Sequence, residues 1–351
     1  MTSKIAFVGA GSWGTSMASV VAGKGESEVV LWARRAELAE TINVFHENPP
    51  YLPGLELPAA LTATNDLEEA LRGADVVVMA VPSHGFRNVL RDVAAIAGRG
   101  PIYMSLTKGL EVDTRMRMSE VIAEEVDGLT DDKISVLTGP NLAKEVMRGY
   151  PAASTIACRD EASGERLQEL VHTPAFRTYR NPDVVGSEIG GALKNVIAIA
   201  AGIADGLGYG DNTKATVVTR GLAEMARFGV KFGAKPLTLL GLAGVGDLMA
   251  TCASPQSRNH SVGIELGKGR KIDEIISSMN MVAEGVKSCK PIFELGQEKG
   301  VWMPITENVV QICHEGATCD EVVKDLLSRE VRYEFEGVEE YLAVTDAQQG
   351  K

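Results

Sequence analysis

Short, continuously apolar runs recur through the first half of the chain, and a segment with helical spacing follows most of them. Such runs are typical of parallel strands that helices cover on both faces, because neither face of the strand meets water. The pattern therefore predicts an α/β domain built on a doubly wound sheet. The predicted strands are Ile5–Val8, Val29–Trp32, Asp75–Val81, Ile102–Leu106, Ile134–Leu137 and Ser154–Ala157.

Beyond about Val185 the pattern changes to long helical segments rich in Ala, Gly and Leu, such as Ile189–Ala204 and Ala215–Phe232. No strand-like run follows, so the second half predicts an all-helical domain. A chain of 351 residues is long enough for two domains, each with its own core. We expect the sheet domain in residues 1–185, a helical substrate domain in 186–340 and a flexible tail in 341–351.

Composition and charge narrow the function classes. The chain is 45% hydrophobic and 23% charged, which is typical of a folded globular protein. Its formal net charge of −12 argues against nucleic acid or an anionic membrane as a partner, since both require a basic face. No run approaches the roughly 20 uncharged apolar residues of a membrane span, and no signal peptide precedes the first strand.

The five cysteines are odd in number, widely spaced and without a CxxC pair. Neither a disulfide framework nor a metal site is indicated, and a reducing cytoplasm fits this usage best.

The motif Gly9-Ala10-Gly11-Ser12-Trp13-Gly14 comes directly after the first strand and opens a helical segment. This context is the one that the Rossmann dinucleotide-binding fingerprint requires. Gly9 would permit the tight turn, Gly11 would let the backbone approach a pyrophosphate, and Gly14 would let the helix pack on the strand.

Arg34 and Arg35 follow the second strand, where an NAD-selective site would place an acidic residue for the ribose hydroxyl. Two guanidinium groups suit a ribose phosphate, so the sequence favours NADP(H), with NAD(H) as a second coenzyme. The alternative is an arginine pair at the exposed start of a helix.

Loops after three further strands should lie at the same edge of the sheet, where ligands bind in this fold. His84 follows one of these strands and is interpreted as a loop residue rather than a catalytic base. Lys108, on a loop bounded by Gly109, offers a cation for a substrate oxygen or is a solvated surface lysine. Gly139 and Asn141 follow the next strand.

Lys194 is the only charge between Ile189 and Ala204. At helical spacing its neighbours are small or apolar, so its ammonium would be buried. Burying a cation is costly, and chains retain one where it has a partner or a chemical task. A catalytic lysine and a salt-bridged structural lysine are the two interpretations.

Two more segments carry polar side chains in glycine-rich or helix-initiating contexts. Asp247 follows Gly244-Val245-Gly246 and is expected on a turn. Ser257, Arg258 and Asn259 precede a helical segment and offer several donors for a phosphate monoester, although a surface turn has the same composition.

Together these motifs closely resemble the NAD(P)-dependent glycerol-3-phosphate dehydrogenase family of the bacterial type. The likeness extends from the first strand to about residue 310. It includes GAGSWGT, VPSH, TKGLE, GGALKNVIAIAAGIADGLGYGDN, TRGLAEMARFG, GLAGVGDL, QSRN, EGV and MPIT.

The resemblance implies a Rossmann domain paired with a helical domain, and it also implies a homodimer. The activity that it implies is the reduction of dihydroxyacetone phosphate to sn-glycerol 3-phosphate for phospholipid synthesis. It implies Lys194 as the catalytic lysine. It implies cofactor contacts at Ser12, Trp13, Arg34, Lys108, Ala143, Arg258, Val282 and Glu284. It implies substrate contacts at Lys108, Gly139, Asn141, Lys194, Asp247, Ser257, Arg258 and Asn259. Asn141 departs from the family pattern, because many relatives have Ser or Thr at this position.

Two other function classes fit parts of the sequence. A β-hydroxyacid dehydrogenase also pairs a Rossmann domain with a helix that carries Lys-Asn, and it would take a carboxylate substrate. A regulator that senses NADP(H) without turnover would need only the first domain's motifs. The phosphate-binding interpretation of Arg258 opposes the first alternative, and the isolated Lys194 opposes the second.

Overall fold

The computed structural model describes residues 2–279 and 283–328. Their contacts divide the chain into two compact units. The sheet unit comprises Met1–Glu111 and Met116–Val184, and the helical unit comprises Val112–Arg115 and Val185–Lys351, each within the described residues. The division after Val184 lies beside the expected boundary at 185, whereas the short segment 112–115 was not expected. The tail predicted at 341–351 lies outside the described residues.

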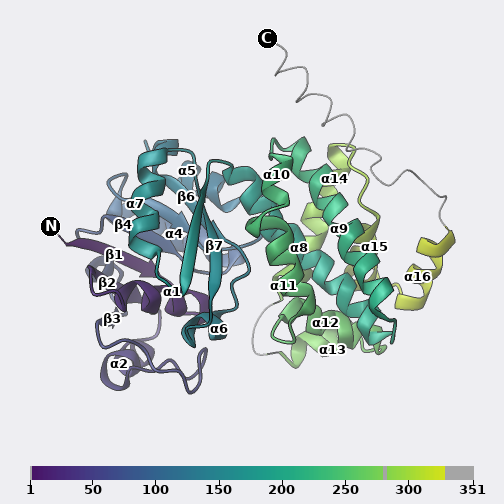
Figure 1. Cartoon of the computed structure of the whole chain (residues 1–351), viewed down its shortest axis with the longest axis horizontal. Coiled ribbons are helices and arrows are strands. Elements are labelled where there is room, and N and C mark those ends of the chain that lie inside the picture. The colour runs from purple at the N-terminus through teal and green to yellow at the C-terminus, as the bar shows by residue number, and fades with distance from the viewer. Residues whose placement is uncertain (1, 280–282, 329–351) are drawn as a thin grey trace, which may run out of the picture. The chain divides into compact units, whose positions relative to one another are not determined.

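The sheet unit is an α/β structure around one eight-stranded sheet of order β3-β2-β1-β4-β5-β6-β7-β8 (Figure 1). The order runs outward from β1 in both directions, as in a doubly wound fold. The fold class predicted from the apolar runs is therefore confirmed. The strands are β1 (Ser3–Val8), β2 (Ser27–Trp32), β3 (Leu61–Thr64), β4 (Val76–Met79), β5 (Ile102–Ser105), β6 (Ile134–Thr138), β7 (Ala152–Cys158) and β8 (Phe176–Asn181).

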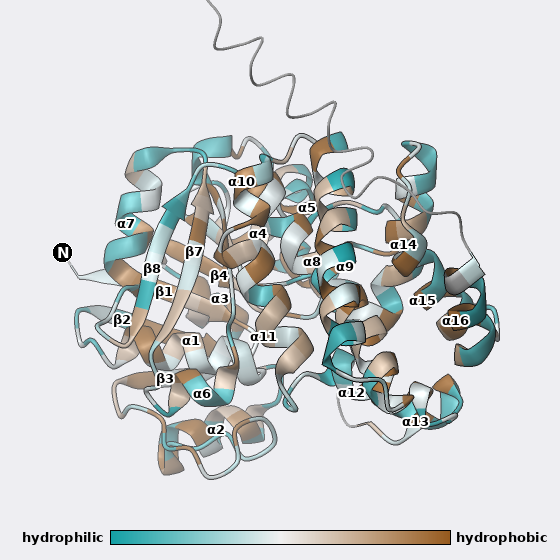
Figure 2. Cartoon of the chain, turned by 45° about the vertical axis from the view of Figure 1, so that its right-hand side comes forward, coloured by the Kyte–Doolittle hydropathy of each residue, from teal (hydrophilic) through white to brown (hydrophobic). Residues whose placement is uncertain are grey.

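The sheet differs from the prediction in two respects. Strands β3 and β8 were not predicted, because both alternate buried with more exposed positions instead of forming a continuous apolar run. Figure 2 shows hydrophilic positions on β8 beside the more hydrophobic β7. The strands were also expected to be parallel throughout, but β7 pairs antiparallel with β6.

Alternate residues of the central strand β1 supply both cores of the sheet unit, as a strand covered on both faces requires. Ile5 and Phe7 belong to one buried cluster, whereas Ala6 and Val8 belong to a second. The helices of this unit are α1 (Ser12–Ala22), α2 (Ala36–Phe45), α3 (Leu67–Leu71), α4 (Ser83–Ala97), α5 (Met118–Glu125), α6 (Ala143–Met147) and α7 (Glu161–Val171), with a 3₁₀ turn at Asp131–Lys133.

The described residues of the helical unit form helices and no strand, as predicted. The helix expected at Ile189–Ala204 is longer and begins before the predicted boundary. The helices are α8 (Val184–Gly206), α9 (Asp211–Lys231), α10 (Pro236–Leu239), α11 (Asp247–Ala253), α12 (Arg258–Gly267), α13 (Ile272–Ser277), α14 (Glu284–Glu298), α15 (Pro304–His314) and α16 (Cys319–Ser328), with a π-helical segment at Leu242–Gly246.

Within the residues that the structure describes, two segments are long and apolar enough, by length and composition alone, to cross a membrane. One is α8, whose most apolar window is 89% buried inside the protein, as in the core helix of a soluble protein. The other, Pro236–Ala253, is 44% buried and consists of two short helices joined through the π-helical segment.

Glycines allow α8 and α12 to touch backbone to backbone. A Cβ added at Gly202 would lie 2.1 Å from the carbonyl oxygen of His260, and one at Gly263 would lie 2.1 Å from that of Ile199. Gly206 and Gly267 repeat this arrangement one turn further along. No larger residue fits without moving a helix, so these glycines fix the position of α12 against the helix that carries Lys194.

Glu224 on α9 is fully buried and caps the N-terminus of α15. Its carboxylate accepts hydrogen bonds from the backbone N–H groups of Ile305 and Thr306 and from the Thr306 hydroxyl. Burial raises the pKa of Glu224 to about 7, although these hydrogen bonds and the charge of Arg227 oppose the shift.

This shift predicts a pH-dependent stability. Because the folded pKa exceeds the ordinary value of 4.5, the contribution of Glu224 is complete below about pH 4.5 and is lost as the pH rises through about 7. The unfolding free energy of wild type, minus that of Glu224→Gln, should fall over this range by up to about 3 kcal/mol. Urea unfolding at several pH values measures the difference, and a pH-independent difference would contradict the assignment.

Candidate active site

The glycine loop between β1 and α1 has the geometry that the fingerprint predicts. Gly9 has φ of +119°, and a Cβ there would lie 2.8 Å from the carbonyl oxygen of Ala80. A Cβ on Gly14 would lie 2.1 Å from the carbonyl oxygen of Gly9. At Gly11, in contrast, an added Cβ meets no protein atom within 4 Å. The protein itself does not require glycine there, so the open space fits a ligand that approaches the backbone.

The N-terminus of α1 favours a negatively charged group such as a pyrophosphate. Gly11 is the N-cap, no side chain caps the helix, and the first turn contains no acidic residue. Its N–H groups can therefore bind an anion. Ser12 donates its hydroxyl to the carbonyl of Tyr51, and the buried Nε1 of Trp13 has no partner among the described residues.

Arg34 and Arg35 lie just beyond the end of β2, and both are exposed. Arg35 is the N-cap of α2, and its guanidinium lies 6.0 Å from the centre of the Tyr51 ring. These cations on an open surface fit the phosphate of NADP(H). The open space at Gly11, the uncapped α1 and this cationic pair each have the chemistry that a dinucleotide requires.

Lys108 follows β5 in the sheet unit, and its Nζ donates to the carbonyl oxygen of Gly139 at 3.0 Å. Thr107 fixes the start of this loop, because its hydroxyl donates to the carbonyl of Val81 at 2.6 Å. Gly139 has φ of +151°, and a Cβ there would press on Ser154. The structure thus brings Lys108 and Gly139 together, and Lys108 is not a freely solvated lysine.

Asn141 has one polar atom engaged and the other without a partner. Its Nδ2 donates to the Ser154 hydroxyl at 3.0 Å, while its buried Oδ1 has no partner among the described residues. The amide has a second N–H, so Asn141 offers a ligand both an acceptor and a donor.

Lys194 on α8 is 7% exposed and pairs with two groups of α11. Its Nζ lies 2.9 Å from Oδ1 of Asp247 and donates to Oγ1 of Thr251 at 2.7 Å. Thr251 in turn donates to the backbone carbonyl of Asp247. An ammonium has three N–H groups, and the described residues give Lys194 two acceptors. One N–H remains for a substrate oxygen.

Thr251 is the member of this cluster that the sequence did not indicate. A threonine inside an apolar helix carries no motif, and only its position four residues after Asp247 could have suggested a shared face. Asp247 was expected on a glycine-rich turn, which is wrong. The preceding glycines form the π-helical segment, and Asp247 is the first residue of α11, where it is 2% exposed.

The segment Ser257-Arg258-Asn259 forms the start of α12. Ser257 is the N-cap, and its hydroxyl accepts from the backbone N–H of His260. Asn259 is buried: its Nδ2 donates to Oδ1 of Asn195, and its Oδ1 accepts from the N–H of Gly285, both at 2.9 Å. Asn259 therefore ties α12 to α8 and α14, leaving one side-chain N–H for a ligand.

Arg258 is the first residue of α12, and it is exposed as a residue. The protein around its guanidinium lowers the pKa of Arg258 by desolvation, which the nearby charge of Glu284 opposes. An arginine remains charged under these conditions. Glu284 is the first residue of α14.

The remaining candidates are placed as follows. Ala143 begins α6, and its carbonyl accepts from the hydroxyl of Ser16 on α1 at 3.2 Å. His84 was interpreted as a loop residue, but it lies exposed in the first turn of α4. Val282 lies outside the described residues. Among residues 2–279 and 283–328, no group of His, Cys, Asp and Glu side chains is arranged to hold a metal ion.

A dinucleotide fingerprint on a doubly wound sheet, joined to a helical unit with a buried Lys-Asp-Thr cluster, defines an NAD(P)-dependent dehydrogenase. Two family models match the chain: NAD-dependent glycerol-3-phosphate dehydrogenase N-terminus at residues 4–164 and the corresponding C-terminus at residues 183–324. The chain therefore belongs to the NAD-dependent glycerol-3-phosphate dehydrogenase family, and it is an oxidoreductase.

Individual relatives cover nearly the whole chain. Glycerol-3-phosphate dehydrogenase [NAD(P)+] of Streptomyces griseus is 53% identical over 94% of this chain and 98% of its own length. The enzyme of Thermobifida fusca is 51% identical over 95% and 99%. The crystal structure of glycerol-3-phosphate dehydrogenase from Coxiella burnetii is 37% identical, covers 93% of this chain and 99% of its own, and superposes with a TM-score of 0.88.

Proposed function

We propose that this chain reduces dihydroxyacetone phosphate to sn-glycerol 3-phosphate, with NADPH or NADH as the reductant. The observation that carries the proposal is the buried Lys194, whose two described acceptors leave one N–H available. The relatives that align with both units are named glycerol-3-phosphate dehydrogenase, and these names support dihydroxyacetone phosphate as the substrate.

When bound, the nicotinamide supplies a hydride to the carbonyl carbon of the substrate. Negative charge then develops on the carbonyl oxygen, which needs a proton and a nearby cation. The free N–H of Lys194 supplies both. Asp247 and Thr251 hold the ammonium in one orientation, so the proton does not have to be brought into position during the reaction.

The remaining roles are divided between the units. In the sheet unit, Gly9, Gly11, Gly14, Ser12 and Trp13 accommodate the pyrophosphate, Arg34 and Arg35 bind the ribose phosphate, and Lys108 and Asn141 bind polar groups of the substrate. In the helical unit, Ser257, Arg258 and Asn259 bind the substrate phosphate at the N-terminus of α12, where an arginine and a helix terminus both favour an anion.

A substrate panel tests this function against its alternatives. Oxidation of NADPH should be fast with dihydroxyacetone phosphate and slow with dihydroxyacetone or with a keto acid. Preference for the keto acid would support a β-hydroxyacid dehydrogenase, and coenzyme binding without oxidation would support a sensor. Neither alternative is favoured by the relatives, which are named for glycerol 3-phosphate.

The proposal extends to the role in the cell. The product would supply the backbone of phospholipids, and the enzyme would act as a cytoplasmic homodimer without integral membrane association. All five cysteines are free thiols in the structure, which supports a reducing compartment. Light scattering of the purified protein tests the dimer.

Arg34 provides a test of coenzyme selectivity. Arg34→Ala should weaken the binding of NADPH by about 1–3 kcal/mol through loss of a charge-assisted contact with the ribose phosphate, with little change for NADH. Titrating the protein with each coenzyme and following the quenching of its intrinsic fluorescence measures both affinities. An equal loss for the two coenzymes would contradict the phosphate contact.

A further inference from the structure

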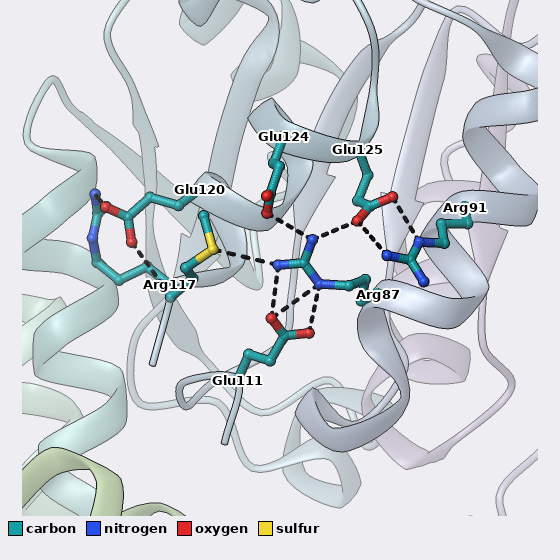
Figure 3. A network of polar contacts seen from close by, with 8 residues as sticks. Arg87, Arg91, Glu111, Arg117, Glu120, Glu124 and Glu125 are labelled. Carbon is teal, nitrogen blue, oxygen red and sulfur yellow. Dashed lines mark hydrogen bonds and ion pairs between the residues drawn. The ribbon is translucent and has the colours of Figure 1, made fainter. Parts of the chain in front are cut away.

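Arg87 on α4 is at the centre of a polar network that the roles above do not use (Figure 3). Its guanidinium forms a bidentate ion pair with Glu111, in which Nε lies 2.9 Å from Oε1 and Nη2 lies 2.7 Å from Oε2. Its Nη1 contacts Glu124, at 2.6 Å, and Glu125, both on α5. The side chains of Arg87 and Glu111 are only 14% and 13% exposed, so water screens this pair weakly.

The network encloses the loop that carries Lys108. Glu111 lies three residues after Lys108. Its backbone N–H donates to the carbonyl of Met116, and this hydrogen bond joins the two segments of the loop, which contain Glu111 and Met116. Arg87 contacts both of these segments, because its Nη2 lies 3.3 Å from Sδ of Met116 in addition to its bond with Glu111. The opposite end of the loop is fixed by Thr107 on Val81. Lys108 therefore lies on a segment held at both ends.

We propose that Arg87 is a positioning residue for Lys108, acting through Glu111. The inference rests on the role of Lys108 in the proposed function. Arg87 is partly buried and is bound on all three of its guanidinium nitrogens, which restricts its orientation and therefore the position of the backbone at Glu111. A lysine side chain has four rotatable bonds, and holding its backbone is what keeps Nζ within reach of the carbonyl of Gly139.

Arg91 provides a matched control, because it belongs to the same network without touching the loop. It lies one turn along α4 and pairs with Glu125, at 2.9 Å. Glu125 is shared with Arg87, and both arginines lower its pKa. Removing Arg91 therefore disturbs the same helix and the same carboxylate, but leaves the contact between Arg87 and Glu111.

The experiment compares kcat/KM for dihydroxyacetone phosphate in two backgrounds. With Lys108 present, Arg87→Gln should lower kcat/KM about tenfold, since a small misplacement of a positioned group has effects of that order. In the Lys108→Ala background the same substitution should change kcat/KM less than twofold, because the group being positioned is absent. Arg91→Gln should have less than a twofold effect in both backgrounds.

Glu111→Gln keeps the shape of the side chain and removes its charge, and it serves as the second variant if Arg87→Gln does not fold. It should reproduce the tenfold loss and the dependence on Lys108. An equal loss in both backgrounds, an equal loss in Arg91→Gln, or no loss at all would overturn the inference. If Lys108→Ala itself has no effect, the role proposed for Lys108 is wrong, which is a separate failure.

Discussion

Lys194→Met is expected to lower turnover by about 10³-fold or more while the protein remains folded. The substitution removes the proton donor and the cation together, and general-acid and electrostatic contributions to catalysis have this combined size. Methionine keeps the length and bulk of the side chain, so packing around α8 should change little. Stopped-flow oxidation of NADPH measures the effect, and coenzyme affinity should be nearly unchanged because the glycine loop belongs to the sheet unit.

A second substitution separates chemistry from stability. Lys194→Met removes the cation paired with the carboxylate of Asp247, which is 2% exposed, and this loss should destabilise the helical unit. Adding Asp247→Asn removes that charge and should restore part of the stability without restoring turnover. If turnover recovered along with stability, Lys194 would be a structural salt-bridge partner and not the proton donor.

Arg258→Ala is expected to raise KM for dihydroxyacetone phosphate by about 10- to 100-fold and to lower kcat as well. A charge-assisted contact with a phosphate has an energy of this order, and binding energy from the phosphate also positions the reacting carbon. Steady-state kinetics with dihydroxyacetone phosphate and with dihydroxyacetone measure the effect. The preference for the phosphorylated substrate should shrink in the variant.

Arg270 offers the control for this prediction. It follows the other end of α12 and pairs with Glu265 at 3.0 Å in an exposed position. Arg270→Ala removes the same charge from the same part of the chain and should leave both constants within about twofold. A wild-type enzyme that reduced dihydroxyacetone as well as its phosphate would show that Arg258 is not a phosphate anchor.

The elements that could be predicted from the sequence are those whose signal is local. The apolar runs of β1, β2, β4, β5 and β6 are buried on both faces, so their composition alone indicates parallel strands of a covered sheet. The spacing of Gly9, Gly11 and Gly14 is likewise set by the backbone of a single turn. Lys194 could be singled out because one charge stands in an apolar helix.

Other features depend on contacts between distant segments. The four residues of β3 and the alternating pattern of β8 become strands through pairing with β2 and β7, and nothing in the sequence shows that β7 pairs antiparallel with β6. The position of α12 is likewise set by glycines 61 residues apart, Gly202 and Gly263, whose fit is visible only once the two helices touch.

The candidate site shows the same division. The sequence indicated which residue types carry the chemistry, including Lys194, Asp247 and Arg258. Only the tertiary structure joined Lys194 to Asp247 and to Thr251, placed Asp247 on a helix, and paired Asn141 Nδ2 with the Ser154 hydroxyl while leaving Oδ1 without a partner among the described residues. Backbone conformation follows largely from neighbouring residues, whereas the partners of Lys194 come from a segment more than 50 residues away and are decided by packing.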